Sequence, residues 1–142
     1  MKKLTTLIVT ASIAAVISGC TSQPSVATAA KLDLNQVCSV EKSGINSVIT
    51  TAAEYNAIAK AEGVEFMRLG MTASQYVEAV QAGIKSGAKT IEIVDKKKKV
   101  TGTMDITEAA QRACRFAVVA LQQKDEAKTF WKQSMPGVGI KY

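Results

Sequence analysis

The stretch TEAAQRACRFAVVALQQKDEAKTFWK, residues 107–132, decides the fold. Its centre, FAVVAL at residues 116–121, places apolar side chains on every side of a helix that has 3.6 residues per turn. A helix that is apolar all round is a buried helix. The stretch therefore predicts one long central helix, with Thr107 as its N-cap, around which the rest of the domain packs.

Two further helices are predicted upstream of this stretch. From Ile45 the apolar residues recur at helical spacing until Gly63 stops the pattern. TASQ at residues 72–75 has the spacing of a capping box, and the helix that it starts ends at Gly87. DLNQ at residues 33–36 has similar spacing and predicts a short helical turn before the first long helix.

Between the second helix and the central helix, the period of the sequence changes from helical to alternating. TIEIV at residues 90–94 alternates and is β-branched, and residues 100–106 do so less cleanly. Asp95 and four lysines lie between them, which predicts a β-hairpin over about 89–106 with a basic tip. The predicted fold is a mainly helical α+β domain, with three or four helices around the central helix and one β-hairpin.

The N-terminus has the organisation of an export signal. MKK at residues 1–3 precedes an uncharged run over residues 4–17, and SGC follows at residues 18–20. The uncharged run is about 14 residues long, whereas a membrane span needs roughly 20. These features predict a cleaved secretion signal, and the alternative is an uncleaved anchor or a plain signal peptide.

The ending ISGC, residues 17–20, resembles the lipobox of bacterial lipoproteins. The resemblance covers only the first 20 residues, and it implies cleavage after residue 19 and lipidation of Cys20. By resemblance to enteric lipoproteins, Thr21 after the cysteine favours the outer membrane, facing the periplasm, over retention in the inner membrane. Acyl chains hold a protein firmly, because each buried methylene contributes about 0.8 kcal/mol.

Length and composition indicate a single domain behind this signal. Residues 20–32 are small and polar and predict a lipidated flexible tether, and residues 33–142 predict one globular domain. The full chain has a net charge of +6, of which Lys2 and Lys3 belong to the signal. This mild excess does not form the dense basic stripes of a nucleic-acid-binding domain, and we expect no nucleic-acid partner.

The three cysteines predict one disulfide. If Cys20 is lipidated, Cys38 and Cys114 remain in a compartment that oxidises paired thiols. A bond between them requires a Cα–Cα distance of about 4.4–6.8 Å. The alternative is two buried free thiols that pack as small hydrophobic residues.

The residue types needed for most catalytic sites are missing from the sequence. The chain has no histidine, which removes Ser–His and Cys–His nucleophile pairs and most zinc sites. The remaining candidates are carboxylate pairs and a serine beside lysines: Glu62 and Glu65, Asp125 and Glu126, and Ser86 near Lys85 and Lys89. We interpret these groups as solvated surface, and we expect no catalytic residue, metal or cofactor.

The run Lys96, Lys97, Lys98 and Lys99 is the feature that points to a partner. In one interpretation it is a solvated hairpin tip whose charge blocks edge-to-edge pairing of strands. In the other it contacts an anionic partner, namely lipid headgroups, glycan phosphate or an acidic protein, with about 1 kcal/mol per lysine near an anionic surface.

The sequence favours a membrane-anchored, non-enzymatic periplasmic lipoprotein that acts as a small protein-binding module. An inhibitor, an immunity or exclusion protein and an accessory factor all fit this class. A structural subunit of a larger cell-envelope assembly is the alternative, and a hydrolase that uses carboxylates alone is a third and weaker one.

Overall fold

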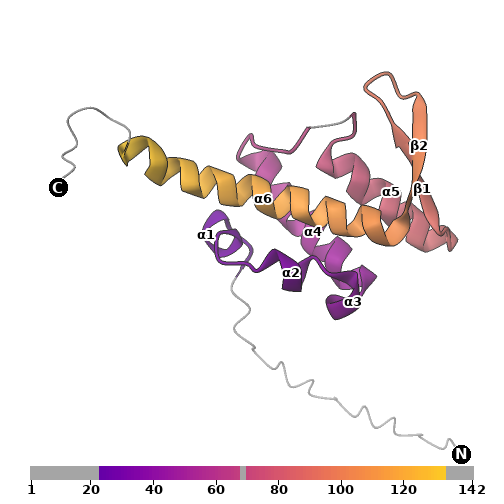
Figure 1. Ribbon diagram of the computed structural model, residues 1–142, viewed down its shortest axis with the longest axis horizontal. Coiled ribbons are helices and arrows are strands. Elements are labelled where there is room, and N and C mark those ends of the chain that lie inside the picture. The colour runs from indigo at the N-terminus through magenta and orange to yellow at the C-terminus, as the bar shows by residue number, and fades with distance from the viewer. Residues whose placement is uncertain (1–22, 68–69, 134–142) are drawn as a thin grey trace, which may run out of the picture.

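The computed structural model describes residues 23–67 and 70–133, with side chains to residue 130. In chain order the elements are α1 (Val26–Ala29), α2 (Leu34–Val37), α3 (Val40–Ser43), α4 (Ile45–Ala61), α5 (Ala73–Ser86), β1 (Thr90–Val94), β2 (Val100–Asp105) and α6 (Ile106–Gln133). Helices packed together with a single β-hairpin form a mainly helical α+β domain, as predicted (Figure 1).

Helix α6 is the element on which the others pack (Figure 1). Its fully buried side chains recur at helical spacing and are mostly small: Ala109, Ala110, Ala113, Cys114, Ala117, Val118 and Leu121. Small side chains let α4 and α5 approach the α6 backbone closely, so the core forms along this contact. The predicted central helix is confirmed, but its turns after residue 122 are largely exposed and extend beyond the core.

The start of α6 differs from the prediction, because Asp105 and not Thr107 caps the helix. The Asp105 carboxylate accepts hydrogen bonds from the backbone N–H groups of Thr107 at 2.8 Å and Glu108 at 3.3 Å. These two backbone bonds hold the pKa of Asp105 below its usual value. Asp105 is also the last residue of β2, so the hairpin passes directly into the helix.

The predicted ends of α5 are confirmed. The Thr72 hydroxyl accepts from the Gln75 N–H at 3.2 Å, and the Gln75 side chain accepts from the Thr72 N–H at 2.8 Å. Gly87 ends the helix in the left-handed conformation, with a φ of 70°. Tyr76 of α5 and Tyr55 of α4 are both buried in the core.

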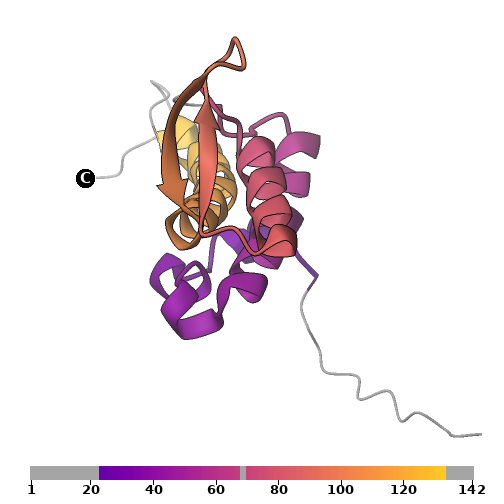
Figure 2. The same ribbon diagram turned by 90° about the vertical axis from the view of Figure 1, so that its right-hand side faces the viewer.

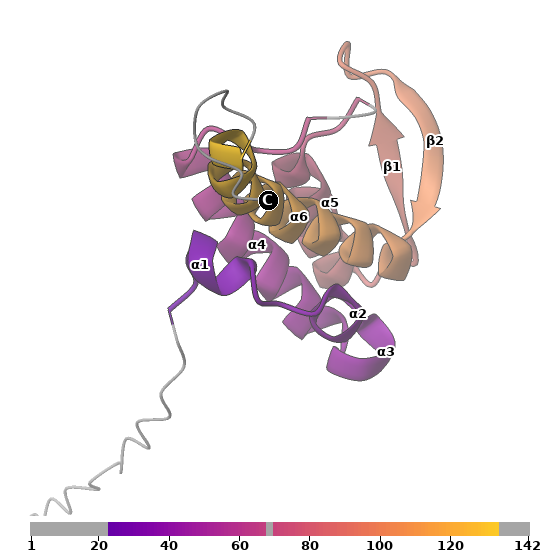
Figure 3. The same ribbon diagram turned by 60° about the vertical axis from the view of Figure 1, so that its left-hand side comes forward.

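The hairpin confirms the predicted change of period. β1 pairs antiparallel with β2 from Thr90 opposite Asp105 to Val94 opposite Val100, and an irregularity after Ile93 leaves Thr101 as an extra residue. Most apolar side chains of the hairpin pack against the helical core and its tip projects beyond the helices, with β1 nearer to α5 and β2 outside it (Figures 2 and 3).

The base of the hairpin is fixed in the core by close packing. Ile91 is buried there, and a Cβ added at Gly83 would lie 2.7 Å from Cδ1 of Ile106. A larger residue at position 83 would require the end of the Ile106 side chain to move, so α5 packs closely against the start of α6 and against Ile91 of β1.

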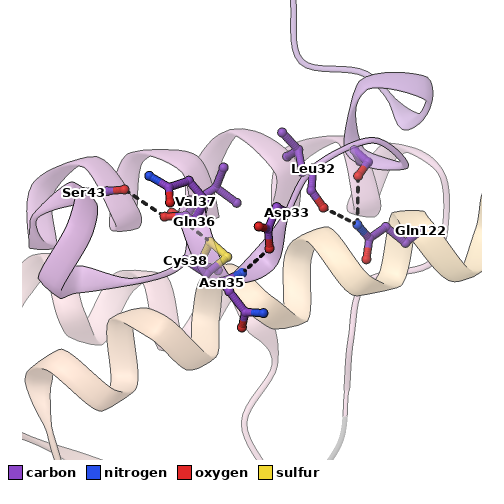
Figure 4. The surroundings of a disulfide bond; sticks show 10 residues. Leu32, Asp33, Asn35, Gln36, Val37, Cys38, Ser43 and Gln122 are labelled. Carbon is purple, nitrogen blue, oxygen red and sulfur yellow. Dashed lines mark hydrogen bonds between the residues drawn. A yellow bond between two sulfur atoms is a disulfide. The ribbon is translucent and has the colours of Figure 1, made fainter.

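The N-terminal boundary of the domain needs correction. The tether was predicted over residues 20–32, but the described part of this segment forms α1 and packs on α6. Ser25 and Thr28 form a capping box, and Ala29 is fully buried. The Gln122 amide donates to the carbonyls of Ala29 and Leu32, each at 3.1 Å (Figure 4). The domain therefore begins before residue 33, because these partly buried carbonyl groups accept hydrogen bonds from a side chain of α6.

Candidate functional site: the lysine tip of the hairpin

Asp95 shapes the tip of the hairpin. Its carboxylate accepts from the backbone N–H groups of Lys97 at 2.8 Å and Lys99 at 2.9 Å. Two backbone bonds close the turn, from Asp95 N–H to the Lys99 carbonyl and from Lys98 N–H to the Asp95 carbonyl, both at 2.9 Å. Lys98 has a φ of 62°, in the left-handed region, which fits this tight turn. The tip is thus held by the Asp95 carboxylate and by backbone hydrogen bonds, and none of these bonds uses a lysine side chain.

The four lysines carry charge without a close acidic partner. Residues 96–99 are exposed. In residues 23–67 and 70–130, the ion pairs join Arg112 to Glu108 at 2.9 Å and Lys124 to Glu62 at 2.6 Å, so neither involves the tip. The structure therefore gathers four positive charges on one protruding turn.

The tip and α1 lie on opposite sides of the molecule (Figures 1 and 3). The hairpin joins α6 at Ile106, whereas α1 is bonded to α6 at Gln122. These two positions are about 24 Å apart along the helix, at 1.5 Å per residue. A chain that enters through α1 therefore reaches the domain far from the lysines.

The predicted disulfide is present in the structure. Cys38 and Cys114 are bonded, with a Cα–Cα distance of 5.5 Å inside the predicted range, and both residues are fully buried (Figure 4). The bond joins the end of α2 to the central helix across 76 positions of sequence. It fixes the N-terminal segment to the most buried element of the fold.

A polar cluster that the sequence did not predict lies between α4 and α5. One oxygen of Glu65 accepts from the Ser74 N–H at 3.0 Å, the Ser74 hydroxyl at 2.5 Å and the Asn56 amide at 3.3 Å. Burial raises the pKa of Glu65, but the hydrogen bonds from Ser74 and Asn56 outweigh burial and hold the pKa below its usual value.

The hydrogen bonds of this cluster hold the start of α5 in place. Glu65 was predicted as solvated surface, which is wrong, because it is half-buried and caps the N-terminus of α5 through Ser74. Asn56 is 4% exposed, and its carbonyl oxygen has no hydrogen-bond partner. The three side chains lie nine and eighteen positions apart, and no short motif signals such a contact.

The other candidate catalytic groups are not brought together. Glu62 pairs with Lys124, whose hydrogen bond and charge hold the pKa of Glu62 below its usual value. The Ser86 hydroxyl donates to the Gly83 carbonyl at 3.1 Å, at the end of α5. Asp125 and Glu126 lie on the outer part of α6. Within the described chain, no three acidic or cysteine side chains are grouped so as to hold a metal ion.

Comparison with protein-family models, curated proteins and solved structures finds no match for this chain. Among residues 23–67 and 70–133, no helix has both the length and the apolar character needed to cross a membrane. The predicted signal over residues 1–19 and the predicted lipidation site Cys20 lie outside the described residues.

Proposed function

We propose that this chain is a lipid-anchored protein of the bacterial envelope that binds another protein through its exposed hairpin. It acts without catalysis, as an inhibitor, an immunity or exclusion protein or an accessory factor. The observation that carries the proposal is the hairpin tip, which presents Lys96–Lys99 to solvent on a turn held by Asp95.

The disulfide supports export to an oxidising compartment. Structural disulfides persist in the periplasm and are rare in the cytosol. Cys38 and Cys114 are bonded, and Cys20 follows a sequence that resembles a lipobox. The anchor and the disulfide are thus consistent with one location, on a membrane facing the periplasm, and Thr21 favours the outer membrane.

The position of the hairpin supports a partner that is not the anchoring bilayer. From Cys20 to Val26 the chain has six residues, which span at most about 21 Å when extended. The anchor therefore holds the α1 side of the domain near the membrane. The lysine tip lies on the other side (Figure 1), where it faces the periplasm.

Replacing the proposed lipidation site tests the anchor. We expect Cys20→Ser to abolish acylation and to release the protein from the membrane fraction, because the thiol that carries the lipid is removed. The neighbouring Ser22→Ala change keeps Cys20 and serves as the matched control. Mass spectrometry of the mature N-terminus gives the readout, and an unmodified Cys20 or a terminus elsewhere contradicts the proposal.

Co-purification from detergent-solubilised membranes separates the module from a structural subunit. A stoichiometric set of envelope proteins, retained after the lysines are replaced by glutamine, indicates a subunit of a larger assembly. A solitary protein, or one partner that is lost when the lysines are replaced, indicates the binding module.

A further inference from the structure

The two edges of the hairpin differ in how far the rest of the domain covers them. Along β1 runs a groove of about 630 Å³ whose opposite wall is α5. At the end of β1, a Cβ added at Gly70 would lie only 2.9 Å from the Val94 carbonyl oxygen. β2 lies on the outside, with its edge turned away from the helices (Figure 3). α5 therefore faces the β1 edge across this groove, whereas no helix of the described chain lies alongside the outer edge of β2.

The hydrogen bonds at the two ends of the hairpin show which backbone groups point outward. Ile106 N–H donates to the Lys89 carbonyl at the base, and Asp95 N–H donates to the Lys99 carbonyl at the tip. Bonded and non-bonded pairs alternate along an antiparallel ladder. The pair Glu92 and Thr103 therefore lies between two hydrogen-bonded pairs and is itself not bonded. The backbone groups of Glu92 face the outer edge of β1, and those of Thr103 face the outer edge of β2.

An open strand edge offers a row of N–H and C=O groups that an extended peptide satisfies as a new strand. On β2 the outward-facing groups are those of Thr103, because its neighbours Gly102 and Met104 lie on rungs bonded to β1. Most residues of the strand are exposed. The bulge at Thr101 ends the regular edge beside the tip, where the exposed lysines begin.

The charges beside this edge indicate an acidic occupant. Lys96–Lys99 stand at one end, whereas Glu92 stands opposite Thr103 at the middle of the hairpin. Carboxylates of a partner are attracted at the tip and repelled at the middle. A second copy is a poorer occupant, because it brings a second set of four lysines and, at the base of its edge, only Asp105, which already caps α6.

We propose that the β2 edge and the lysine tip form one docking surface, on which an extended acidic segment of a partner protein adds as a third strand. The segment runs antiparallel to β2, the commoner arrangement, and places a cluster of carboxylates at its C-terminal end against Lys96–Lys99. This proposal rests on the proposed function, for which it names the binding surface and the class of partner.

A display library of random nine-residue peptides, selected on the full chain as isolated from its bacterium, tests this surface. We expect the selected peptides to alternate β-branched residues and to end in two or more carboxylates. Their affinity falls as salt rises, because exposed charges are screened. The experiment measures peptide binding by the domain and does not depend on lipidation. A negative result here is therefore distinct from a negative result in the test of Cys20 lipidation.

Two proline variants on the same rung separate the two edges. Proline removes one backbone N–H and is tolerated where that group faces outward from an edge strand. We expect Thr103→Pro to weaken peptide binding about tenfold or more, because the new strand loses its donor and meets the proline ring. Glu92→Pro makes the same change on the β1 edge and is the matched control, with binding within about twofold of the parent.

Each outcome decides the proposal. Loss of binding in Thr103→Pro and in a variant with Lys96–Lys99 replaced by glutamine, with retention in Glu92→Pro, supports it. Circular dichroism and retention of the disulfide show that the variants fold. Equal binding by both proline variants, selected peptides without carboxylates, or no enrichment overturns the proposal. A dimer in sedimentation that Thr103→Pro dissociates identifies a second copy as the occupant and also overturns it.

Discussion

The N-terminal segment and the hairpin are both attached to α6, but they are attached in different ways. The N-terminal segment consists of three one-turn helices, α1 to α3, fixed by a buried disulfide and by the Gln122 amide. The hairpin has no covalent link, and it is held at its base through Ile91 while its tip stands in solvent. Helices of one turn are not stable alone, so they depend on contacts that the rest of the fold supplies.

The comparison shows that stability and exposed charge are separated in this molecule. The side of α6 that carries the N-terminal segment contains the disulfide and the half-buried Gln122 amide, whereas the hairpin end presents four lysines. Substitutions on the side that carries the N-terminal segment are expected to alter the free energy of unfolding, and substitutions at the hairpin tip are expected to alter partner binding. The predictions below test that separation, from the largest expected effect to the smallest.

Removing the disulfide is expected to have the largest effect on stability. The bond closes a loop of about 77 residues, for which the loss of chain entropy in the unfolded state corresponds to about 4.5 kcal/mol. The double variant Cys38→Ala and Cys114→Ala should lose most of this free energy of unfolding in a urea titration. The parent protein unfolded under reducing conditions is the control, and a loss below about 1 kcal/mol would show that the N-terminal segment is held without the bond.

The charge of Glu65 is expected to contribute next. The isosteric change Glu65→Gln removes a charged acceptor from Ser74 and Asn56 and should cost about 1.5–3 kcal/mol at pH 7. The folded pKa is below the ordinary value of 4.5, so this stability is complete above that pH and is lost as pH falls through the folded pKa.

Denaturant unfolding at a series of pH values measures this contribution. The difference between parent and Glu65→Gln should shrink as the pH falls below 4.5. The exposed Glu78→Gln is the matched control on α5. A constant difference at every pH would contradict the assignment to the carboxylate.

The Gln122 amide is expected to have a smaller effect that is confined to α1. Gln122→Ala leaves the carbonyls of Ala29 and Leu32 without their donor and should cost about 1–2 kcal/mol. Hydrogen exchange should rise at α1 more than at α4 or α5, because the contact is local. The adjacent exposed Gln123→Ala is the control, and equal effects of the two changes would be inconsistent with a specific contact.

The lysines are expected to have the smallest effect on stability. Replacing Lys96–Lys99 with glutamine keeps both backbone N–H groups that donate hydrogen bonds to the Asp95 carboxylate. The free energy of unfolding should therefore change by less than about 0.5 kcal/mol. Asp95→Ala breaks these bonds and should destabilise the turn more than the four lysine changes together. A large loss from the lysine changes would mean that their side chains build the tip.

The sequence predicted the elements whose signals are local. The capping box at Thr72 and the left-handed Gly87 follow from short spacings, and the alternation over residues 90–94 distinguishes the hairpin from the helices. The pairing of Cys38 with Cys114 followed from the count of cysteines and the predicted compartment. It needed no knowledge of the fold.

The features that the sequence missed depend on distant contacts or on small residues. VATA in α1 has too few large apolar residues to show a helical period, yet Ala29 is buried because a small side chain fits against α6. The spacing of Ser25 and Thr28 was the available signal. Thr107 and Asp105 are both good capping residues, and only the end of β2 at Asp105 decides between them.

The position of the disulfide sets how the domain would respond to mechanical load. A pull between an anchored Cys20 and a partner at the hairpin tip passes through the N-terminal segment into α6. Helices α1 and α2 would detach first, because α1 is held by hydrogen bonds and small packed side chains and both helices precede the disulfide. Unfolding of this segment would stop at Cys38, because from there the load would enter Cys114 through a covalent bond. The chain from Cys20 to Cys38 would by then span at most about 63 Å. If the chain is anchored at Cys20, residues 20–38 would thus act as an extensible linker of fixed maximum length, and the core would bear tension only once that linker is fully extended.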